Sequence, residues 1–381
     1  MQRGRPQSRG RAPQGQHLDI RSFINKAVIV EEVDHFIPEH EFSDFLIDEK
    51  LKKNIATKGY IAPTSIQDRT IPHILKGQDV VGIANTGTGK TAAFLIPLIN
   101  KMMKDPSQSV LIVVPTRELA TQINDELKGF APGTGLFSVV CVGGTQMGPQ
   151  LRELKYKNHF IIGTPGRLKD LIERRALDLS KTTSVVLDEA DRMLDMGFMP
   201  DMKFIMGQMP AERHTLFFSA TMSKEIEKLI HEFCREPVSI SVKTQDTSKN
   251  VDQDIVRMKA GEDKLVALEN ILKHEGSNKV LIFGRTKHGV ERLAKTLSTR
   301  GFLADSIHGD KSQGQRQRAL DAFKTNKIKI LVATDVAARG LDIPKVSHVI
   351  NYDLPATYED YIHRIGRTGR AGETGKALTF V

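Results

Sequence analysis

The stretch Ala84-Asn85-Thr86-Gly87-Thr88-Gly89-Lys90-Thr91 decides the fold, because it joins an apolar run to a run of helix-forming residues. This order predicts a strand, a glycine loop and a helix. Gly87 and Gly89 lack a β-carbon, so their amides can approach phosphate oxygens, while the new helix adds its positive end and Lys90 adds a mobile charge. Thr91 follows where a hydroxyl can hold Mg²⁺. The stretch therefore predicts a site for the phosphates of a nucleotide.

The loop departs from the general phosphate-loop pattern at its first residue, where Ala84 stands in place of glycine. A glycine-rich turn that binds no ligand is the alternative interpretation. It is disfavoured because Gly-Lys-Thr after a buried strand is a costly arrangement to keep without an anion.

Length and charge bound the class of protein. The 381 residues exceed what one hydrophobic core usually organises, so we expect two domains and a tail. The net charge of +9 favours polyanionic partners, but it does not distinguish nucleic acid from another anionic surface. Cys141 and Cys234 lie far apart in the sequence and predict neither a disulfide framework nor a zinc site.

The apolar runs are far shorter than the roughly 20 residues that cross a bilayer, and the chain opens without an apolar signal segment. We therefore expect a cytoplasmic protein with no membrane partner. The first residues place Arg3, Arg5, Arg9 and Arg11 among Gly, Pro, Gln and Ser, a composition that predicts disorder. These arginines either hold RNA phosphates loosely or belong to a solvated tail.

Gln67 lies shortly before the phosphate loop. Its amide offers the donor and acceptor pair that matches N6 and N7 of adenine, which indicates ATP rather than GTP. Taken alone, a glutamine at such a place is more often an ordinary capping residue.

Three strands predicted after the loop end in residues suited to phosphates. Residues 110–114, 138–142 and 160–162 lead into Pro115-Thr116-Arg117-Glu118-Leu119-Ala120, Gly143-Gly144 and Thr164-Pro165-Gly166-Arg167. In an open parallel sheet the carboxyl ends of the strands form the edge where ligands bind, and helices that begin there favour anions. Each short motif alone is a common turn, but three at one edge indicate a phosphate-rich ligand.

Acidic residues follow the next predicted strand, residues 183–187. A carboxylate at a strand end beside a phosphate loop can bind Mg²⁺ through water, which assigns Asp188 as a metal ligand. Its neighbour Glu189 can orient or deprotonate the attacking water. Two acids side by side are unfavourable without a cation. Ser219-Ala220-Thr221, after another strand, is too short to assign by itself.

The second half repeats the strand and helix series without a phosphate loop. A polar stretch at residues 237–254 marks the domain boundary. Residues 363–370, His-Arg-Ile-Gly-Arg-Thr-Gly-Arg, contain more arginine than a surface helix needs. Arginines from a second domain can stabilise charge on a transferring γ-phosphoryl group. The alternative is that they bind phosphates of a nucleic acid.

Taken in order, these motifs resemble the DEAD-box family of ATP-dependent RNA helicases within superfamily 2. The resemblance covers the chain from about Phe42 onwards, and it accounts for Ala84, since the family's loop begins with alanine. The motifs that carry it are the Gln67 segment and residues 84–91, 115–120, 143–144, 164–167, 188–191, 219–221, 333–342 and 363–370.

The resemblance implies roles for individual residues. Residues that would bind ATP are Phe42, stacked on adenine, Gln67, the loop residues Ala84, Asn85, Thr86, Gly87, Thr88, Gly89, Lys90 and Thr91, and Asp342 at the ribose. Catalytic residues would be Lys90, Asp188, Glu189, Arg367 and Arg370, with Thr91 and Asp188 at Mg²⁺. Coupling between hydrolysis and RNA would involve Asp191, Ser219, Thr221 and His363. The RNA backbone would contact Pro115, Arg117, Gly144, Thr164 and Arg167, with Arg285 and Thr334 from the second domain.

The predicted fold is α/β, with two RecA-like domains that each hold a mostly parallel sheet flanked by helices. A basic and largely disordered extension at residues 1–38 would precede a first domain at 39–240, a linker at 241–253 and a second domain at 254–381. The implied activity is an RNA-stimulated ATPase that closes on single-stranded RNA and separates short duplexes, with ATP and Mg²⁺ as cofactors and a monomeric core. A slowly turning RNA clamp and a DNA-directed translocase of the same superfamily are the alternatives.

Overall fold

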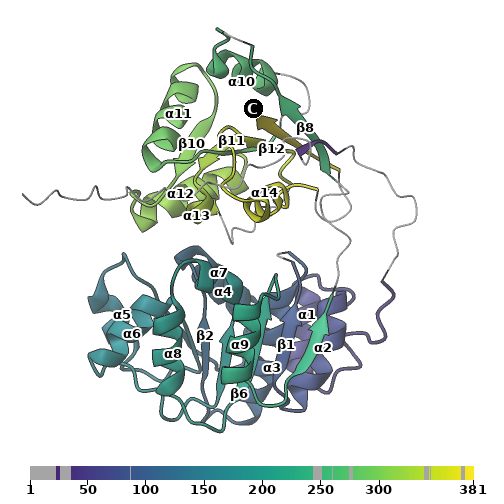
Figure 1. Ribbon diagram of the computed structural model, residues 1–381. Helices are drawn as coiled ribbons and strands as arrows, with labels where there is room; N and C mark the ends of the chain where they lie inside the picture. Colours follow the sequence, from purple (N-terminus) through teal and green to yellow (C-terminus); the bar gives the residue numbers. More distant parts are fainter. Residues whose placement is uncertain are drawn as a thin grey trace, which may run out of the picture.

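Two parallel sheets, each covered by helices on both faces, form the architecture (Figure 1). The computed structural model describes residues 23–25, 36–85, 87–242, 251–259, 261–273, 278–338, 343, 345–369 and 374–381. The first body contains the phosphate loop and the second contains residues 363–369. The predicted α/β class with two RecA-like domains is confirmed.

The first sheet is seven-stranded, in the order β3-β4-β2-β5-β6-β1-β7, and every neighbouring pair is parallel. Its strands are β1 (Val80–Ile83), β2 (Val110–Val113), β3 (Ser138–Cys141), β4 (Phe160–Gly163), β5 (Ser184–Leu187), β6 (His214–Ser219) and β7 (Val238–Ser241). Its helices are α1 (Glu49–Thr57), α2 (Ser65–Leu75), α3 (Lys90–Lys104), α4 (Arg117–Phe130), α5 (Met147–Glu153), α6 (Pro165–Glu173), α7 (Ala190–Asp195), α8 (Met199–Gly207) and α9 (Lys224–Phe233).

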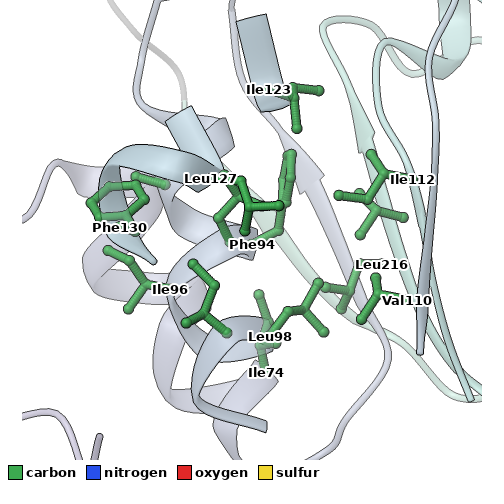
Figure 2. Close-up of a cluster of buried hydrophobic side chains, with 14 of the residues drawn as sticks. Ile74, Phe94, Ile96, Leu98, Val110, Ile112, Ile123, Leu127, Phe130 and Leu216 are labelled. Carbon is green, nitrogen blue, oxygen red and sulfur yellow. The ribbon is translucent and has the colours of Figure 1, made fainter. Parts of the chain in front are cut away.

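Strand alternation divides the first core into two layers. Successive residues of a strand point to opposite faces, so Val110 and Ile112 pack with Phe94 of α3, whereas Leu111 and Val113 pack on the other face. Figure 2 shows part of this layer, in which Phe94 of α3 and Leu127 of α4 belong to one cluster with Ile112 of β2 and Leu216 of β6. Apolar residues cover both faces of the sheet, which is the pattern expected for a buried parallel sheet.

The second sheet is six-stranded, in the order β10-β11-β9-β12-β13-β8, again parallel throughout. Its strands are β8 (Val251–Val256), β9 (Val280–Phe283), β10 (Ala304–Ile307), β11 (Ile330–Ala333), β12 (His348–Asn351) and β13 (Gly375–Phe380). Its helices are α10 (Lys264–Lys273), α11 (Lys287–Thr299), α12 (Gln313–Lys324), α13 (Asp335–Ala338) and α14 (Tyr358–Ile365). In Figure 1, α12, α13 and α14 lie on the side of this body that faces α4 and α7 of the first.

The structure differs from the predicted domain division in two places. Residues 251–253, which the prediction assigns to the linker, form the first half of β8 and pair with β13. Phe23 falls in the extension predicted to be largely disordered, yet it is 1% exposed and packs against the second domain. The polar composition of residues 251–253 predicts a linker, but these residues form part of a strand. Val251 and Gln253 are buried, whereas the acids between and after them are partly exposed. We therefore propose that the second domain begins at Val251.

Replacing Gly82 in β1 with alanine is expected to destabilise the first domain. A β-carbon there would lie 2.5 Å from Cε1 of Phe218, whose ring is fully buried against Phe94. Overpacking of this kind lowers the free energy of unfolding by about 1–3 kcal/mol. Urea unfolding followed by circular dichroism measures the change.

Gly207→Ala is the matched control, because a β-carbon at the end of α8 would meet nothing within 4 Å. Its unfolding midpoint should equal or slightly exceed that of the unsubstituted protein. Equal midpoints for Gly82→Ala and the unsubstituted protein would show that the packing of Phe218 against Gly82 does not constrain the sheet.

Candidate nucleotide and RNA site

The phosphate loop joins β1 to the first turn of α3 in the predicted order. Gly87 and Gly89 both adopt positive φ angles, 86° and 95°, a backbone region that glycine adopts readily. Lys90 is buried, and its Nζ donates a hydrogen bond of 2.8 Å to the carbonyl of Ala84. Thr88 Oγ1 closes the loop with a bond of 2.8 Å to the carbonyl of Asn85. Thr86 lies outside the described residues.

Gln67 is hydrogen-bonded to Gly89 of the phosphate loop. Its side-chain oxygen accepts from the amide of Thr64 at 2.9 Å, and its Nε2 donates to the carbonyl of Gly89 at 3.1 Å. A β-carbon at Gly89 would crowd that Nε2, and the positive φ of Gly89 independently favours glycine. This side chain is 1% exposed and supports the loop. Recognition of adenine by Gln67 stays a prediction.

Phe42, the residue expected to stack on adenine, is 6% exposed in the first core. Its ring makes edge contacts with Phe45 and Tyr60, with ring centroids 6.0 Å apart in both pairs. The aromatic contacts fix the segment before α2. Stacking on a base also stays a prediction.

The two predicted catalytic acids lie at the end of β5. Asp188 is 3% exposed, and burial raises the pKa of its carboxyl to about 6, although the charge of Lys90 acts in the opposite direction. Its Oδ1 accepts the amide of Glu189 at 2.9 Å. Glu189 adopts a positive φ of 52°, a strained angle for a residue with a side chain. A buried carboxylate whose charged form is disfavoured is suited to binding a cation.

A cavity of about 480 Å³ brings the phosphate loop and these acids together. Gly87, Gly89, Lys90 and Thr91 line it with Asp188 and Glu189. The described residues contain no group of three or more His, Cys, Asp or Glu that could hold a metal ion. The Thr91 hydroxyl and the Asp188 carboxylate fit a Mg²⁺ site in which the protein supplies one carboxylate and the phosphates of the substrate supply further oxygen ligands.

Asp191 connects the acids to Ser219-Ala220-Thr221. Its Oδ2 accepts from the amides of Ala220 and Thr221 at 3.0 Å each and from Thr221 Oγ1 at 3.1 Å. The hydroxyl of Ser219 donates to the carbonyl of Thr221 at 2.8 Å. The structure therefore brings together three of the four predicted coupling residues. The fourth, His363, lies on α14 of the second domain, where its carbonyl accepts from Arg367 Nε at 3.3 Å.

The arginines of residues 363–369 differ in environment. Arg364, which the sequence analysis left without a role, forms two bonds of 2.6 and 2.8 Å to the carboxylate of Asp335. It also donates to Oδ1 of Asn351 in β12 at 3.1 Å and is 2% exposed, so it fixes α14 to the sheet. Arg367 is also buried, at 5% exposed. Arg370 and Asp342 lie outside the described residues.

The predicted RNA contacts of the first domain gather at the carboxyl ends of β2, β3 and β4. Arg117 lies against Gly144, where a β-carbon would approach its guanidinium nitrogen to 1.8 Å. Arg167 Nη2 donates to the carbonyl of Thr145 at 3.2 Å, and its Nη1 is buried without a hydrogen bond within the described part of the chain. Thr164 precedes α6, and Pro115 is buried after β2. At this edge of the sheet, two arginine side chains lie beside the backbone at Gly144 and Thr145.

Two predicted RNA contacts belong to the second domain. Arg285 follows β9, where its amide donates to Asp353 Oδ2 at 2.8 Å and its side chain is exposed. Thr334 follows β11, and its carbonyl accepts from the amides of Ala337 and Ala338. Both residues therefore lie at carboxyl ends of strands, as do the contacts of the first domain.

Contacts between the two domains escaped the sequence analysis. Arg316 of α12 forms an ion pair of 2.9 Å with Glu118 of α4, and their side chains are 10% and 3% exposed. Arg192 bonds Glu189 through Nη1 and donates through Nη2 to the carbonyl of Val336, at 3.0 Å in each case. Lys324 of α12 also lines the cavity. No sequence signal marks Arg316 or Lys324, because each lies in an ordinary amphipathic helix.

The site combines a glycine-rich loop, a carboxylate pair and basic strand ends on two RecA-like domains, which defines a nucleoside triphosphatase. Family models agree: residues 64–229 match "DEAD/DEAH box helicase" and residues 263–372 match "Helicase conserved C-terminal domain". Within the described residues, every helix is too short or too polar to cross a bilayer.

Curated relatives include an ATP-dependent RNA helicase CshA of Listeria monocytogenes, 45% identical over 90% of this chain and 66% of the relative. The Bacillus subtilis DEAD-box ATP-dependent RNA helicase CshA is 45% identical over 89% of this chain and 69% of the relative. The chain thus spans about two thirds of the length of these two relatives.

Solved structures of similar fold include Saccharomyces cerevisiae Dbp5 bound to RNA and ADP BeF3, with 30% identity, a TM-score of 0.80 and coverage of 90% and 89% of the two chains. Mss116p bound to single-stranded RNA and AMP-PNP is 31% identical, with a TM-score of 0.80 and coverage of 91% and 76%. The chain belongs to the DEAD-box family of ATP-dependent RNA helicases, which are ATP-hydrolysing enzymes.

The pair between Glu118 and Arg316 supplies a test of domain contact. Glu118→Ala and Arg316→Ala should each weaken binding of single-stranded RNA in the presence of AMP-PNP, because each leaves a buried charge without its partner. A loss of about 2–5 kcal/mol is expected. The double variant should lose less than the sum of the two single losses. Fluorescence anisotropy of labelled RNA measures all three.

Glu232→Ala is the control, because its ion pair with Lys203 is about half exposed and should change the affinity by less than about 0.5 kcal/mol. Strictly additive losses in the double variant would show that Glu118 and Arg316 do not interact when RNA is bound.

Proposed function

We propose that this protein is an RNA-stimulated ATPase that closes on single-stranded RNA and separates short duplexes or remodels RNA–protein complexes without processive movement. One observation carries the proposal: the cavity at the phosphate loop is lined by residues of both domains, with Lys324 contributed by the second. A nucleotide in that cavity would therefore stabilise the contact between the domains.

The comparisons support the same arrangement. The TM-score is 0.80 against Dbp5 and against Mss116p, both solved with RNA and a nucleotide analogue. It is 0.53 against a DEAD box protein of Methanococcus jannaschii, although the sequence identity is higher there, at 38%. Similarity over the whole chain is thus greater for the two relatives that hold both ligands.

ATP would bind with its phosphates on the loop, held by Lys90, and with adenine near Phe42 and Gln67. Thr91 and Asp188 would hold Mg²⁺, which when bound neutralises charge on the phosphate oxygens. Glu189 would orient or deprotonate water, and its bond to Arg192 keeps its carboxylate fixed. In the second domain, Arg367 and Arg370 would stabilise the transferring phosphoryl group, and Asp342 would contact the ribose.

RNA would lie along the carboxyl ends of the strands. Arg117 and Arg167 of the first domain, together with Gly144, present donors and open backbone to phosphates. Arg285 and Thr334 would contact the same strand from the second domain. Contacts of this kind read the backbone and give little sequence preference.

Coupling follows from the shared surfaces. If ATP and RNA each bind residues of both domains, each favours the closed form, and the two affinities must be linked reciprocally. Asp191 and Thr221 would carry the change after hydrolysis, because their bonds connect the acids to the loop after β6. His363 would complete this path from the second domain.

We further propose a cytoplasmic protein with a monomeric core. An ATP-locked RNA clamp remains the second candidate, because the same contacts that favour closure would also slow release. A DNA-directed translocase is disfavoured by the Gln67 segment and the run Asp188-Glu189-Ala190-Asp191.

The test of the function is ATP hydrolysis with and without RNA, together with release of a short labelled duplex. We expect RNA to raise kcat at least about 10-fold and single-stranded DNA to do much less, since 2′-hydroxyl contacts distinguish the two. Duplex release over many turnovers identifies a helicase, and a single slow release identifies a clamp. Equal stimulation by DNA and RNA would contradict the RNA assignment.

Glu189→Gln should keep ATP-dependent RNA binding while hydrolysis falls by at least about 100-fold, because glutamine can still bond Arg192 but cannot act as a base. Phosphate release and RNA anisotropy measure the two properties on one sample. Glu232→Gln, on the exposed surface of the same domain, should match the unsubstituted protein. Unchanged turnover in Glu189→Gln would remove the role given to Glu189.

A further inference from the structure

A short segment far upstream of the phosphate loop packs into the second domain. Phe23 is 1% exposed and lies in an apolar cluster with Val251, Tyr361, Ile365 and Ala377. Its ring centroid is 4.6 Å from that of Tyr361. A fully buried aromatic side chain contributes more to packing than any other feature of so short a segment.

Backbone pairing holds the same segment. The amide of Asn25 donates to the carbonyl of Gln253 at 3.1 Å, and the amide of Gln253 donates back to Asn25 at 2.7 Å, as in an antiparallel pair. Gln253 belongs to β8, which is the last strand of its sheet. The pair thus satisfies groups that an edge strand otherwise leaves open. The side chain of Gln253 is 1% exposed and accepts from Tyr361 Oη at 2.9 Å.

Phe23 therefore contacts the helix that carries the proposed phosphate-binding arginine. Tyr361 and Ile365 belong to α14, and Arg367, just beyond its end, bonds the carbonyl of His363 within it. The same helix is also fixed by Arg364, which bonds the carboxylate of Asp335. The position of α14 thus depends on two anchors, one polar and one apolar.

The chain continues from this anchor to the first domain's side of the nucleotide site. The amides of Glu39 and His40 donate to the carboxylate of Asp68 at 2.9 and 3.2 Å. Asp68 adjoins Gln67, whose amide contacts the carbonyl of Gly89 in the phosphate loop. Phe23 is therefore bound to the second domain, whereas Glu39 and His40, further along the same chain, are bound to the first.

We propose that Phe23 and Asn25 form a docking segment that completes the outer edge of the second sheet and holds α14 where Arg367 serves ATP hydrolysis. Phe23 is a positioning residue, since it acts through Tyr361. The role in hydrolysis rests on the function proposed above, whereas docking of the segment does not.

The test compares Phe23→Ala with Ile24→Ala in the full chain. Ile24 is the matched control, because it is the neighbouring apolar residue and is 44% exposed. Phe23→Ala should lower the RNA-stimulated kcat by about 10- to 100-fold with KM for ATP changed less than about twofold, because α14 is displaced while the phosphate loop is intact. Phe23→Leu, which keeps apolar volume, should recover most of the loss.

Hydrogen exchange, read on the same samples, follows docking without reference to activity. Amides of β8 around Gln253 and amides of α14 should exchange faster in Phe23→Ala than in the unsubstituted protein, and at an unchanged rate in Ile24→Ala. Amides of β5 should exchange at the same rate in all samples, because the first domain stays folded in each.

The outcomes test the docking of Phe23 and its positioning role separately. Unchanged exchange at Gln253 overturns the docking. Faster exchange with an unchanged kcat overturns the positioning role, as does an equal loss of kcat in Ile24→Ala. If the unsubstituted protein shows no RNA-stimulated hydrolysis, the function proposed above fails together with the positioning role, while exchange still decides the docking.

Discussion

The burial of Asp188 beside Lys90 is the constraint on which the rest of the site depends. A carboxyl group at 3% exposure, with its pKa raised to about 6, is unfavourable in the charged state unless a cation compensates it. The parallel sheet places this group at the end of β5, on the same edge as the loop after β1. Positive φ angles at Gly87 and Gly89 open that loop towards phosphates. In the function proposed above, Mg²⁺ bound with ATP would supply that cation.

The second constraint is that residues of the second domain contact the site on the first. Arg192 bonds Glu189 within the first domain and Val336 across the interface, so the proposed base and the domain contact share one guanidinium. Glu118 and Arg316 add a buried ion pair nearby. Such pairs favour a defined geometry more than they favour stability, because desolvation offsets much of their attraction. The interface is thus suited to a form that assembles and separates.

Local pattern sufficed for much of this protein. The strand, loop and helix around Lys90, the acids after β5 and the parallel sheets were all predictable, because each depends on residues close in sequence. Partners far apart in sequence were not. Phe23 follows an arginine-rich stretch of sequence, and its partner Tyr361 is more than 300 residues away in the sequence. Arg316 and Lys324 have the sequence context of ordinary helix residues. Gln67, which is predicted to bind adenine, donates a hydrogen bond to the carbonyl of Gly89 that the sequence did not indicate.

The pairing of β8 with β13 and of Phe23 with Tyr361 has a consequence for biosynthesis. Phe23 leaves the ribosome well before its partners, because Tyr361 and Ala377 lie 338 and 354 residues further along the sequence. At about 5–20 residues per second, the aromatic ring waits on the order of 20–70 s for its partners. The nascent first domain can fold during that interval, whereas β8 can join the second sheet only after β13 has been translated.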